Sequence, residues 1–382
     1  MSTNDNPQTN TLRLFLCGDV MTGRGIDQAL PHPVDPVLYE PYVRDAGEYV
    51  ELAEKAHGPF QRPVTFDYIW GETLQELDRA RVDLRIINLE TAITSAETPW
   101  PDKQIHYRMH PQNIACLRAA RISGCALANN HVLDWGYEGL SETLLTLGAV
   151  QIAHAGAGND AVEAAAPAVL DVPGKGRALL FSFGSTSSGI PRDWRARSIS
   201  PGTNLLEDIS ETGATRIATE MRQVKRPSDL LVASIHWGGN WGYEIPREQI
   251  AFAHRLIEEG VAVVHGHSSH HVKAIEVFKG RLILYGCGDF LTDYEGISGY
   301  EKFRGDLALM YLVELHSRSG ELMSVRLVPM QMRRFRLEHA SAADADLLCD
   351  LLNTLGRQFG TTAQLTEENG TYLINIAVRV EK

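Results

Sequence analysis

Cysteine is scarce in this chain and is not arranged to form cross-links. The 382 residues contain five cysteines, which are widely spaced and include no CxxC pair. A secreted disulfide scaffold needs an even and dense set of cysteines, and a thiolate zinc site needs closely spaced pairs. The sequence argues against both classes, and we expect reduced thiols in a cytoplasmic protein.

Long apolar segments are also missing. No run approaches the ~18 apolar residues that a membrane-spanning helix needs. The first residues, MSTNDNPQTNT, have neither a basic start nor an apolar stretch, so we expect no secretory signal. The sequence therefore predicts a protein without a membrane span.

Positive charge is in deficit. Lysine and arginine number 36 against 48 acidic residues, which gives a net charge of −12 at pH 7. An acidic surface repels phosphate backbones and anionic lipids, so neither nucleic acid nor a bare membrane is expected as a partner. An acidic chain can instead gather carboxylates around a divalent metal, and a local cationic site can still bind an anion.

The chain has enough apolar residues for a large core, since 44% of them are hydrophobic. We expect a disordered segment at residues 1–10, a main α/β domain over residues 11–340, and a helix and strand at residues 341–382 that extend the same domain. Residues 27–65 are rich in proline and are expected to form an irregular insertion.

Polar residues repeatedly follow short apolar segments that are typical of buried strands. Such strands are predicted at residues 11–17, 83–87, 124–128, 229–235 and 262–264, with helices at residues 73–80, 111–120, 139–147, 249–259 and 342–359. A final strand is predicted at residues 372–380. In α/β sheets, ligands bind beyond the carboxyl ends of the strands, so the five polar clusters are expected to converge on one rim.

The first two clusters offer oxygen ligands. Asp19 directly follows a buried strand, which fixes its carboxylate for a hard or borderline cation. Asn88 and Glu90 lie two residues apart and face the same way on an extended segment. A turn cap and an Asx turn are the structural alternatives. Arg24 can offer its guanidinium to an anionic substrate group, or it is a surface arginine of a loop.

The segment Asn130-His131 combines a ligand with an acid–base group. An asparagine carbonyl oxygen is a workable metal ligand, and the adjacent imidazole can act as acid or base or can stabilise negative charge. Asp134 follows three residues later and can orient the imidazole of His131. The alternative is a loop rich in turn-forming residues.

The segment HGHSSHH, residues 265–271, gives the strongest indication of a metal site. Four imidazoles in seven residues repel each other when protonated, so they favour the neutral form that binds a metal. The pattern leaves open which of the four bind. His236 ends an apolar strand, and we interpret it as a ligand because the other polar clusters are expected to converge with it. Asp289, in YGCGDF, is expected to lie behind the ligands or to belong to a structural turn.

The order of these motifs resembles the metallophosphoesterase (calcineurin-like) signature. More closely, GDVMTGR, NLE, ANNHVLDWGYEGL, SIHWGGNW, HGHSSHHVKAIE and YGCGDF resemble the CapA family of capsule and poly-γ-glutamate biosynthesis proteins, over about residues 12–315. The resemblance implies an α/β four-layer sandwich, in which two mixed β-sheets are flanked by helices.

The resemblance also implies roles for individual residues. The implied metal ligands are Asp19, Glu90, Asn130, His236, His267 and His270. His131 is implied to protonate a leaving group or to stabilise the transition state, and Arg24 and Asp134 complete the candidate catalytic set. Met21 stands where phosphoesterases usually have a histidine, and Glu90 where they have an aspartate. One of the two usual metal sites is therefore expected to be weak or absent.

Three functions are compatible with this pattern. The leading hypothesis is a metal-dependent hydrolase that acts on a small anionic or peptide-like substrate through a metal-activated water. The alternatives are a metal-dependent peptide epimerase that removes and returns an α-proton, and a non-catalytic protein that binds polyglutamate. Mixed oxygen and imidazole ligands without thiolates suit one or two ions of Mn²⁺, Fe²⁺ or Zn²⁺.

Overall fold

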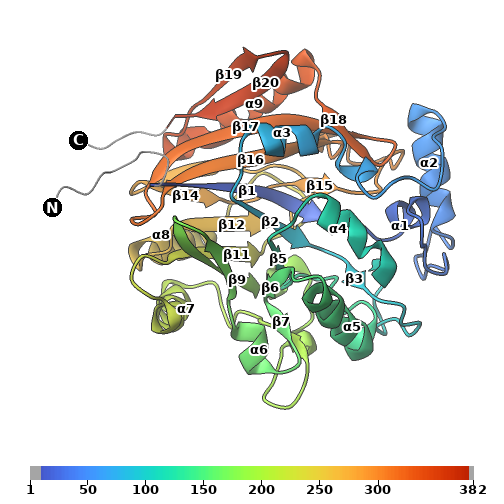
Figure 1. Ribbon diagram of the computed structural model, residues 1–382, viewed down its shortest axis with the longest axis horizontal. Coiled ribbons are helices and arrows are strands. Elements are labelled where there is room, and N and C mark those ends of the chain that lie inside the picture. Colours follow the sequence, from blue (N-terminus) through green and yellow to red (C-terminus); the bar gives the residue numbers. More distant parts are fainter. Residues whose placement is uncertain (1–9, 378–382) are drawn as a thin grey trace.

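The larger of two β-sheets is built around β1 (Thr11–Val20), which is buried along almost its whole length. The computed structural model describes residues 10–377, and Figure 1 shows β1 near the middle of the sheet. The strands follow the order β19-β20-β17-β16-β1-β2-β5-β6, with β15 paired to β1 and β18 paired to β17. The strands are β2 (Leu84–Leu89), β5 (Gly124–Ala126), β6 (Ala153–Ala155), β15 (Asp289–Leu291), β16 (Leu307–His316), β17 (Leu322–Arg333), β18 (Arg336–His339), β19 (Ala363–Glu368) and β20 (Thr371–Ile376).

The second sheet follows the order β13-β14-β12-β11-β9-β8. Its strands are β8 (Ala168–Val172), β9 (Gly176–Gly184), β11 (Leu230–His236), β12 (Val263–His267), β13 (Ile275–Phe278) and β14 (Arg281–Leu284). Parallel pairing joins β9, β11, β12 and β14, while β8 and β13 add antiparallel edges. Two short pairs stand apart, β3 (Ala92–Ile93) with β4 (Arg108–Met109) and β7 (Ala157–Gly158) with β10 (Gly202–Thr203).

Alternation along the strands divides the core into layers. In β1, Leu14 and Leu16 point into the apolar cluster between the two sheets, whereas Phe15 and Cys17 point into the cluster under the helices on the other face. Successive side chains of a strand point to opposite faces, so a strand that is apolar throughout can serve two cores. The sequence of β1 therefore places it inside a sandwich.

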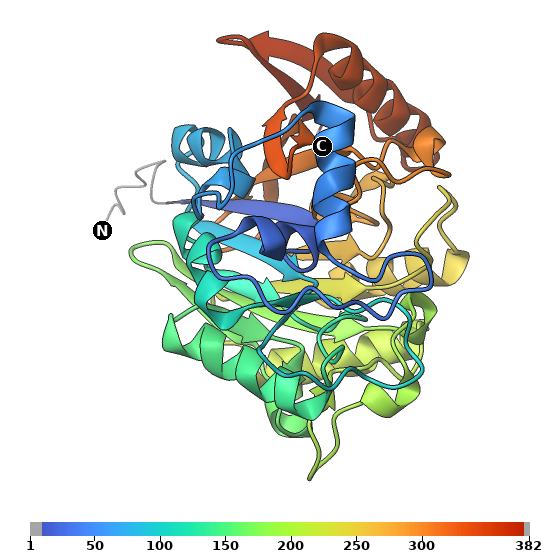
Figure 2. The ribbon, with the colours of Figure 1, turned by 90° about the vertical axis from the view of Figure 1, so that its right-hand side faces the viewer.

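Helices cover both outer faces, as Figures 1 and 2 show. The helices are α1 (Gly25–Ala29), α2 (Gly47–His57), α3 (Thr73–Arg79), α4 (Ala115–Ala119), α5 (Gly136–Ala149), α6 (Ala161–Ala165), α7 (Glu211–Val224), α8 (Arg247–Glu258) and α9 (Ala342–Gly356). Side chains of α3, α4 and α5 pack on the larger sheet, and those of α7 and α8 pack on the smaller one. The four-layer α/β sandwich with two mixed sheets is confirmed.

The helices form where apolar residues recur on one face. In α7, Ala214, Ile217, Ala218 and Met221 are buried, a spacing that forms one apolar stripe. The helix begins after Ser210, whose hydroxyl accepts a hydrogen bond from the Gly213 N–H at 3.0 Å. Among residues 10–377, no helix is long and apolar enough to cross a bilayer.

Two expectations from the sequence were wrong. Residues 27–65 are not irregular throughout, because α2 occupies residues 47–57 and buries Tyr49, Val50 and Ala53. The prolines of this region flank α2 and do not interrupt it. The chain after residue 341 contains two strands, β19 and β20, where one was expected. The predicted disorder at residues 1–9 and the end of the predicted strand, residues 378–380, lie outside the described residues.

Candidate metal centre

The polar residues at the strand ends meet between the two sheets. Asp19 lies near the end of β1, and Glu90 directly follows the neighbouring strand β2. His236 and His267 are the last residues of β11 and β12, where they are paired in register. One half of the centre thus comes from each sheet, as the convergence of strand ends predicts.

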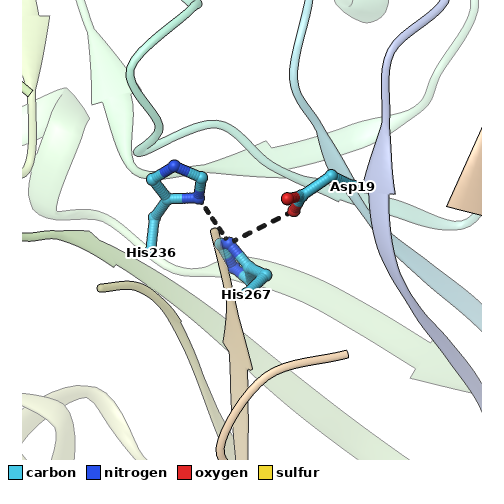
Figure 3. Close-up of side chains that lie close together, drawn as sticks. All are labelled: Asp19, His236 and His267. Carbon is cyan, nitrogen blue, oxygen red and sulfur yellow. Dashed lines mark hydrogen bonds and ion pairs between the residues drawn. The ribbon is translucent and has the colours of Figure 1, made fainter. Parts of the chain in front are cut away.

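Asp19, His236 and His267 form the core of the centre. One ligand atom from each lies within 4.8 Å of the others, and all three side chains are buried. Figure 3 shows the two imidazoles and the carboxylate facing one another, with His267 in the middle. His267 Nδ1 is 2.8 Å from His236 Nδ1 and 3.9 Å from a carboxylate oxygen of Asp19. The other ring nitrogen of His267 contacts the Ser234 hydroxyl at 2.9 Å, which fixes the orientation of the ring.

Burial sets the protonation of these groups. It lowers the pKa of His236 and of His267 well below the ordinary value, and neighbouring positive or imidazole groups add to the effect. Both rings are therefore neutral near pH 7 and have a lone pair for a metal. Burial, and to a smaller extent the neighbouring Asp289, raises the pKa of Asp19 to about 7. The ionised form of Asp19 is therefore unfavourable unless a cation lies nearby.

Glu90 and Asn130 border this core. Glu90 Oε1 is 3.7 Å from His236 Nε2, and Asn130 Oδ1 is 3.0 Å from the same nitrogen. Asn88 links the carboxylates, because its side-chain nitrogen donates to Asp19 at 2.7 Å and to Glu90 at 2.9 Å. Its oxygen accepts a hydrogen bond from Asn129 instead of facing the centre. Burial, with Asp19 and Asp289 nearby, raises the pKa of Glu90 well above the ordinary value.

The histidine-rich segment divides into two pairs. His267 and His270 face the centre, whereas His265 contacts the carbonyl oxygen of Cys17 at 2.7 Å and the Ser234 hydroxyl at 3.1 Å. His271 accepts a hydrogen bond from the Gly242 N–H at 3.0 Å, away from the centre. The geometry therefore leaves His267 and His270 as the candidate ligands of this segment.

His270 and Asp289 form a second group around Asp19. Ligand atoms of these three buried residues also lie within 4.8 Å of one another. His270 Nδ1 is 2.9 Å from Asp289 Oδ1. Burial acts to lower the pKa of His270, but the carboxylates of Asp289 and Asp19 outweigh it and raise that pKa. Asp289 thus lies beside Asp19 and contacts the candidate ligand His270; its place behind the ligands stays a prediction.

His131 lies at the edge of the centre with Asp134 behind it. The predicted contact between the two is present, with Asp134 Oδ2 2.7 Å from His131 Nδ1. His131 Nε2 is 3.9 Å from Glu90 Oε1. Lys103 also contacts His131 Nδ1 at 3.0 Å and forms an ion pair with Asp134. Burial lowers the pKa of His131 to about 4, against the effect of Asp134, so the imidazole is neutral at pH 7.

Arg24 forms ion pairs and hydrogen bonds with other residues of the fold. Its guanidinium forms ion pairs with Asp293 and Glu40 and donates to the Tyr49 hydroxyl at 3.0 Å. Only 3% of the residue is exposed. The interpretation of Arg24 as a surface arginine is wrong. A direct contact between Arg24 and substrate stays a prediction.

The chemistry of the donors fits a divalent cation. One carboxylate oxygen of Asp19 and one of Asp289 are buried without a hydrogen-bond partner among the described residues. A buried anionic oxygen is costly unless it is paired or binds a metal. Oxygen and imidazole donors without thiolates suit Mn²⁺, Fe²⁺ or Zn²⁺.

Sequence reasoning missed Lys103, which stands in a loop with no neighbouring motif. Its position follows from the path of residues 97–107, which brings its ammonium beside His131. A lysine between an aspartate and a histidine cannot be recognised from spacing, since 28 residues separate it from His131.

Comparison with known proteins places the chain among relatives. A chain from Mycobacterium tuberculosis H37Rv named "Probable polyglutamine synthesis accessory protein" is 44% identical, over 95% of this chain and 96% of that one. "Capsule biosynthesis protein CapA" of Bacillus anthracis is 22% identical, over 85% of this chain and 69% of its own length. "PGA biosynthesis protein CapA" of Bacillus subtilis is 22% identical, over 79% of this chain and 68% of its own length.

A solved structure, TT1561 of Thermus thermophilus, aligns with 82% of this chain and 97% of its own, at 11% identity and a TM-score of 0.35. The model of the family described as "Bacterial capsule synthesis protein PGA_cap" matches residues 13–294. With that match and the 44% identical relative, the chain belongs to the PGA_cap family of bacterial capsule synthesis proteins, and the CapA resemblance is confirmed.

Proposed function

We propose that this protein is a divalent-metal-dependent hydrolase that acts in polyglutamate biosynthesis. The observation that carries the proposal is the buried set of Asp19, His236 and His267, in which both imidazoles are neutral and one carboxylate oxygen has no partner among the described residues. Burial of the ionised carboxylate costs free energy unless a cation is bound, and the neutral imidazoles can bind that cation.

The residues that would bind the ion are Asp19, His236 and His267, with Glu90 and Asn130 at the border. A divalent ion bound by these residues would lower the pKa of a bound water and would polarise a phosphoryl or carbonyl oxygen. Ser234 orients His267, and Asn88 positions the carboxylates of Asp19 and Glu90 through its side-chain nitrogen. Mutual positioning of this kind is typical of the residues behind metal ligands.

His131 is the candidate for proton transfer. Asp134 contacts Nδ1 of the ring, so Nε2 is the nitrogen that points toward Glu90 and the centre. A neutral imidazole at pH 7 can accept a proton at Nε2, or can donate from Nε2 when Lys103 donates to Nδ1. His131 therefore serves as an acid–base group beside the centre and not as a ligand.

The substrate class follows from charge and from the relatives. The names of the relatives refer to synthesis of polyglutamine, of a capsule and of PGA. With a divalent ion bound, the centre would attract an anionic group, although the net charge of the protein is −12. We propose a small anionic or peptide-like substrate with a phosphoester or γ-glutamyl bond. We also propose a cytoplasmic location, since all five thiols are buried and unpaired.

A second candidate is peptide epimerisation. The observation that favours it is the contact between His270 and Asp289, an imidazole and a carboxylate 2.9 Å apart beside Asp19. Groups of this kind can remove a proton from an α-carbon and return it to the other face. Exchange with solvent deuterium distinguishes this reaction from hydrolysis.

The test uses metal-free protein reconstituted with Mn²⁺ or Zn²⁺. We expect turnover of a generic phosphodiester or of a γ-glutamyl oligomer that depends on the ion and is lost in His236→Ala. Deuterium incorporation at a peptide α-carbon without cleavage would support the epimerase. Binding of polyglutamate without either reaction would show a non-catalytic protein and contradict the proposal.

A further inference from the structure

Positively charged side chains gather around a surface cavity outside the candidate metal centre. Its volume is about 430 Å³, within the range of ligand sites, roughly 300–1,000 Å³. Five cationic side chains line it, but only two carboxylates do. The cationic residues of this basic cavity are Arg13, Arg79, Arg81, Lys175 and Arg326. We propose that the basic cavity binds a chain of glutamate residues through its carboxylates. The inference rests on the proposed function only where it selects carboxylates over phosphates.

The basic cavity and the metal centre lie at opposite ends of the strands. Arg13 lies near the beginning of β1, whereas Asp19 lies near its end. They are six residues apart, which is about 20 Å along an extended strand. Asp83 directly precedes β2 and Lys175 directly precedes β9, so both sheets contribute the beginnings of strands to the basic cavity. The basic cavity is therefore a site separate from the metal centre.

The outer face of the larger sheet holds the arginines. Arg13 lies on β1 and Arg326 on β17, on either side of β16. Their sequence neighbours Leu14 and Val325 point between the two sheets, so both arginines point to the outer face. The segment 79–81, at the end of α3, brings two more arginines to this cavity. The cations thus come from separate parts of the chain and meet because of the fold.

The two carboxylates of the basic cavity already have partners. Asp83 accepts from the Lys175 ammonium at 2.7 Å and 2.8 Å and from the Arg13 N–H at 2.8 Å. Glu314 accepts from the Arg13 side chain at 2.9 Å and from the Ser324 hydroxyl at 3.0 Å. Each oxygen of the two carboxylates is therefore bonded before any ligand binds.

Two of the arginines have no counter-charge. Arg79 forms an ion pair with Glu76, which also contacts His339 at 3.1 Å. Arg81 and Arg326 form no ion pair with any of residues 10–377. Both line a cavity that has three other cations, and like charges repel one another. A bound anion would relieve this repulsion.

Guanidinium groups favour a ligand with carboxylates. The planar end of an arginine can donate two parallel hydrogen bonds to one carboxylate, a geometry that a lysine ammonium does not offer. Two such groups in one cavity suit a chain that presents carboxylates one after another, because linked groups bind more tightly than separate ones. The local positive charge attracts such a chain here, although the net charge of the protein is −12.

The test is binding of a fluorescent γ-linked glutamate oligomer to the whole 382-residue chain, measured by fluorescence anisotropy. Wild type should bind the oligomer more tightly than free glutamate, and less tightly at high salt. The double variant Arg81→Gln/Arg326→Gln should bind it about 10-fold more weakly, as expected for the loss of two exposed charge pairs. The metal content and thermal unfolding of this variant should match those of the wild type.

The double variant Arg247→Gln/Arg357→Gln is the matched control. Both arginines are exposed and lie outside the basic cavity, at the beginning of α8 and directly after α9. The control therefore loses the same charge without a change in the cavity. It should bind the oligomer as the wild type does.

Four outcomes would overturn the inference. They are unchanged oligomer binding by Arg81→Gln/Arg326→Gln, an equal loss of binding in the control, loss of binding in His236→Ala, which would place the oligomer at the metal centre, and displacement by less polyphosphate than unlabelled oligomer. Each leaves the proposed function intact, because none measures turnover. Oligomer binding as expected, but no metal-dependent turnover by the wild type, would contradict the proposed function and retain the basic cavity.

Discussion

At the scale of single residues, burial decides which protonation states the centre can use. The imidazoles of His131, His236 and His267 all have lowered pKa values, whereas the carboxyls of Asp19 and Glu90 have raised ones. Each shift disfavours the charged form of its group, as expected for charges removed from water. A bound cation reverses the balance for the carboxyls, because it stabilises the ionised form.

The neighbours Asn130 and His131 should separate metal binding from chemistry. His131→Ala should leave the metal content near that of the wild type and lower turnover by ~10²–10⁴-fold, the usual contribution of one acid–base group. Asn130→Ala should lower both, because Asn130 contacts His236. Elemental analysis beside an activity assay measures both quantities. Loss of metal from His131→Ala would make His131 a ligand, and full activity in that variant would return it to a structural role.

Lys103 should tune the pKa of His131. Its ammonium lies 3.0 Å from the ring and disfavours the imidazolium form. In Lys103→Met, the pKa of His131 should rise, so the acidic limb of the pH–activity profile should move to higher pH. Lys175→Met, which removes an ion pair with Asp83, is the control and should leave the limb in place. An unchanged or acid-shifted limb in Lys103→Met would contradict this assignment.

At the scale of elements, the close approach of β1 and β15 positions the carboxylate of Asp19. Gly18→Ala would place a Cβ 1.6 Å from the Gly288 carbonyl oxygen. Overpacking of this kind costs about 1–3 kcal/mol of unfolding free energy. We expect lower stability and weaker metal binding, measured by urea unfolding and metal content.

Gly148→Ala in α5 is the control for that variant. An added Cβ there meets no atom within 4 Å, so stability should stay the same or rise by up to ~1 kcal/mol through helix propensity. Equal effects of the two substitutions would show that the contact between β1 and β15 does not matter.

His339 in β18 connects its strand to α3. Its two ring nitrogens contact Glu72 at 3.0 Å and Glu76 at 3.1 Å. The hydrogen bond with Glu76, acting against burial, raises the pKa of His339 above 6.5. A raised pKa stabilises the folded state below pH 6.5, and this contribution disappears as the pH rises through the folded-state value.

His339→Gln should therefore destabilise the protein near pH 6 and have little effect at alkaline pH. The expected difference is below ~1 kcal/mol, because the pair is partly exposed and screened by solvent. Urea unfolding of wild type and variant at both pH values measures it. A difference that stays constant with pH, or grows as the pH rises, would show that the ion pairs do not contribute.

The sequence predicts the strands that end at the candidate metal ligands better than it predicts the helices and loops around the centre. Buried strands before Asp19, Asn88, His236 and His267 were expected from short apolar runs, and each is present. The helix α2 was missed because the prolines on both sides of it led us to expect an irregular segment over residues 27–65. Lys103 was missed, because the path of a loop is a tertiary feature without a local pattern.

At the scale of the whole molecule, the centre connects the two sheets. Asp19 and Glu90 come from the larger sheet, and His236 and His267 come from the smaller one. An ion that binds residues of both sheets binds only the assembled sandwich. Ligands that bind the folded state alone raise its stability by about 2.7 kcal/mol at a concentration 100-fold above Kd.

The most direct test is thermal unfolding of metal-free protein titrated with Mn²⁺ or Zn²⁺, with the bound metal measured at each point. Wild type should take up the ion and unfold at a higher temperature as the ion concentration rises. His236→Ala should fold but gain little stability and lose most of the bound metal. A wild type that neither carries a divalent ion nor gains stability from one would contradict the metal centre.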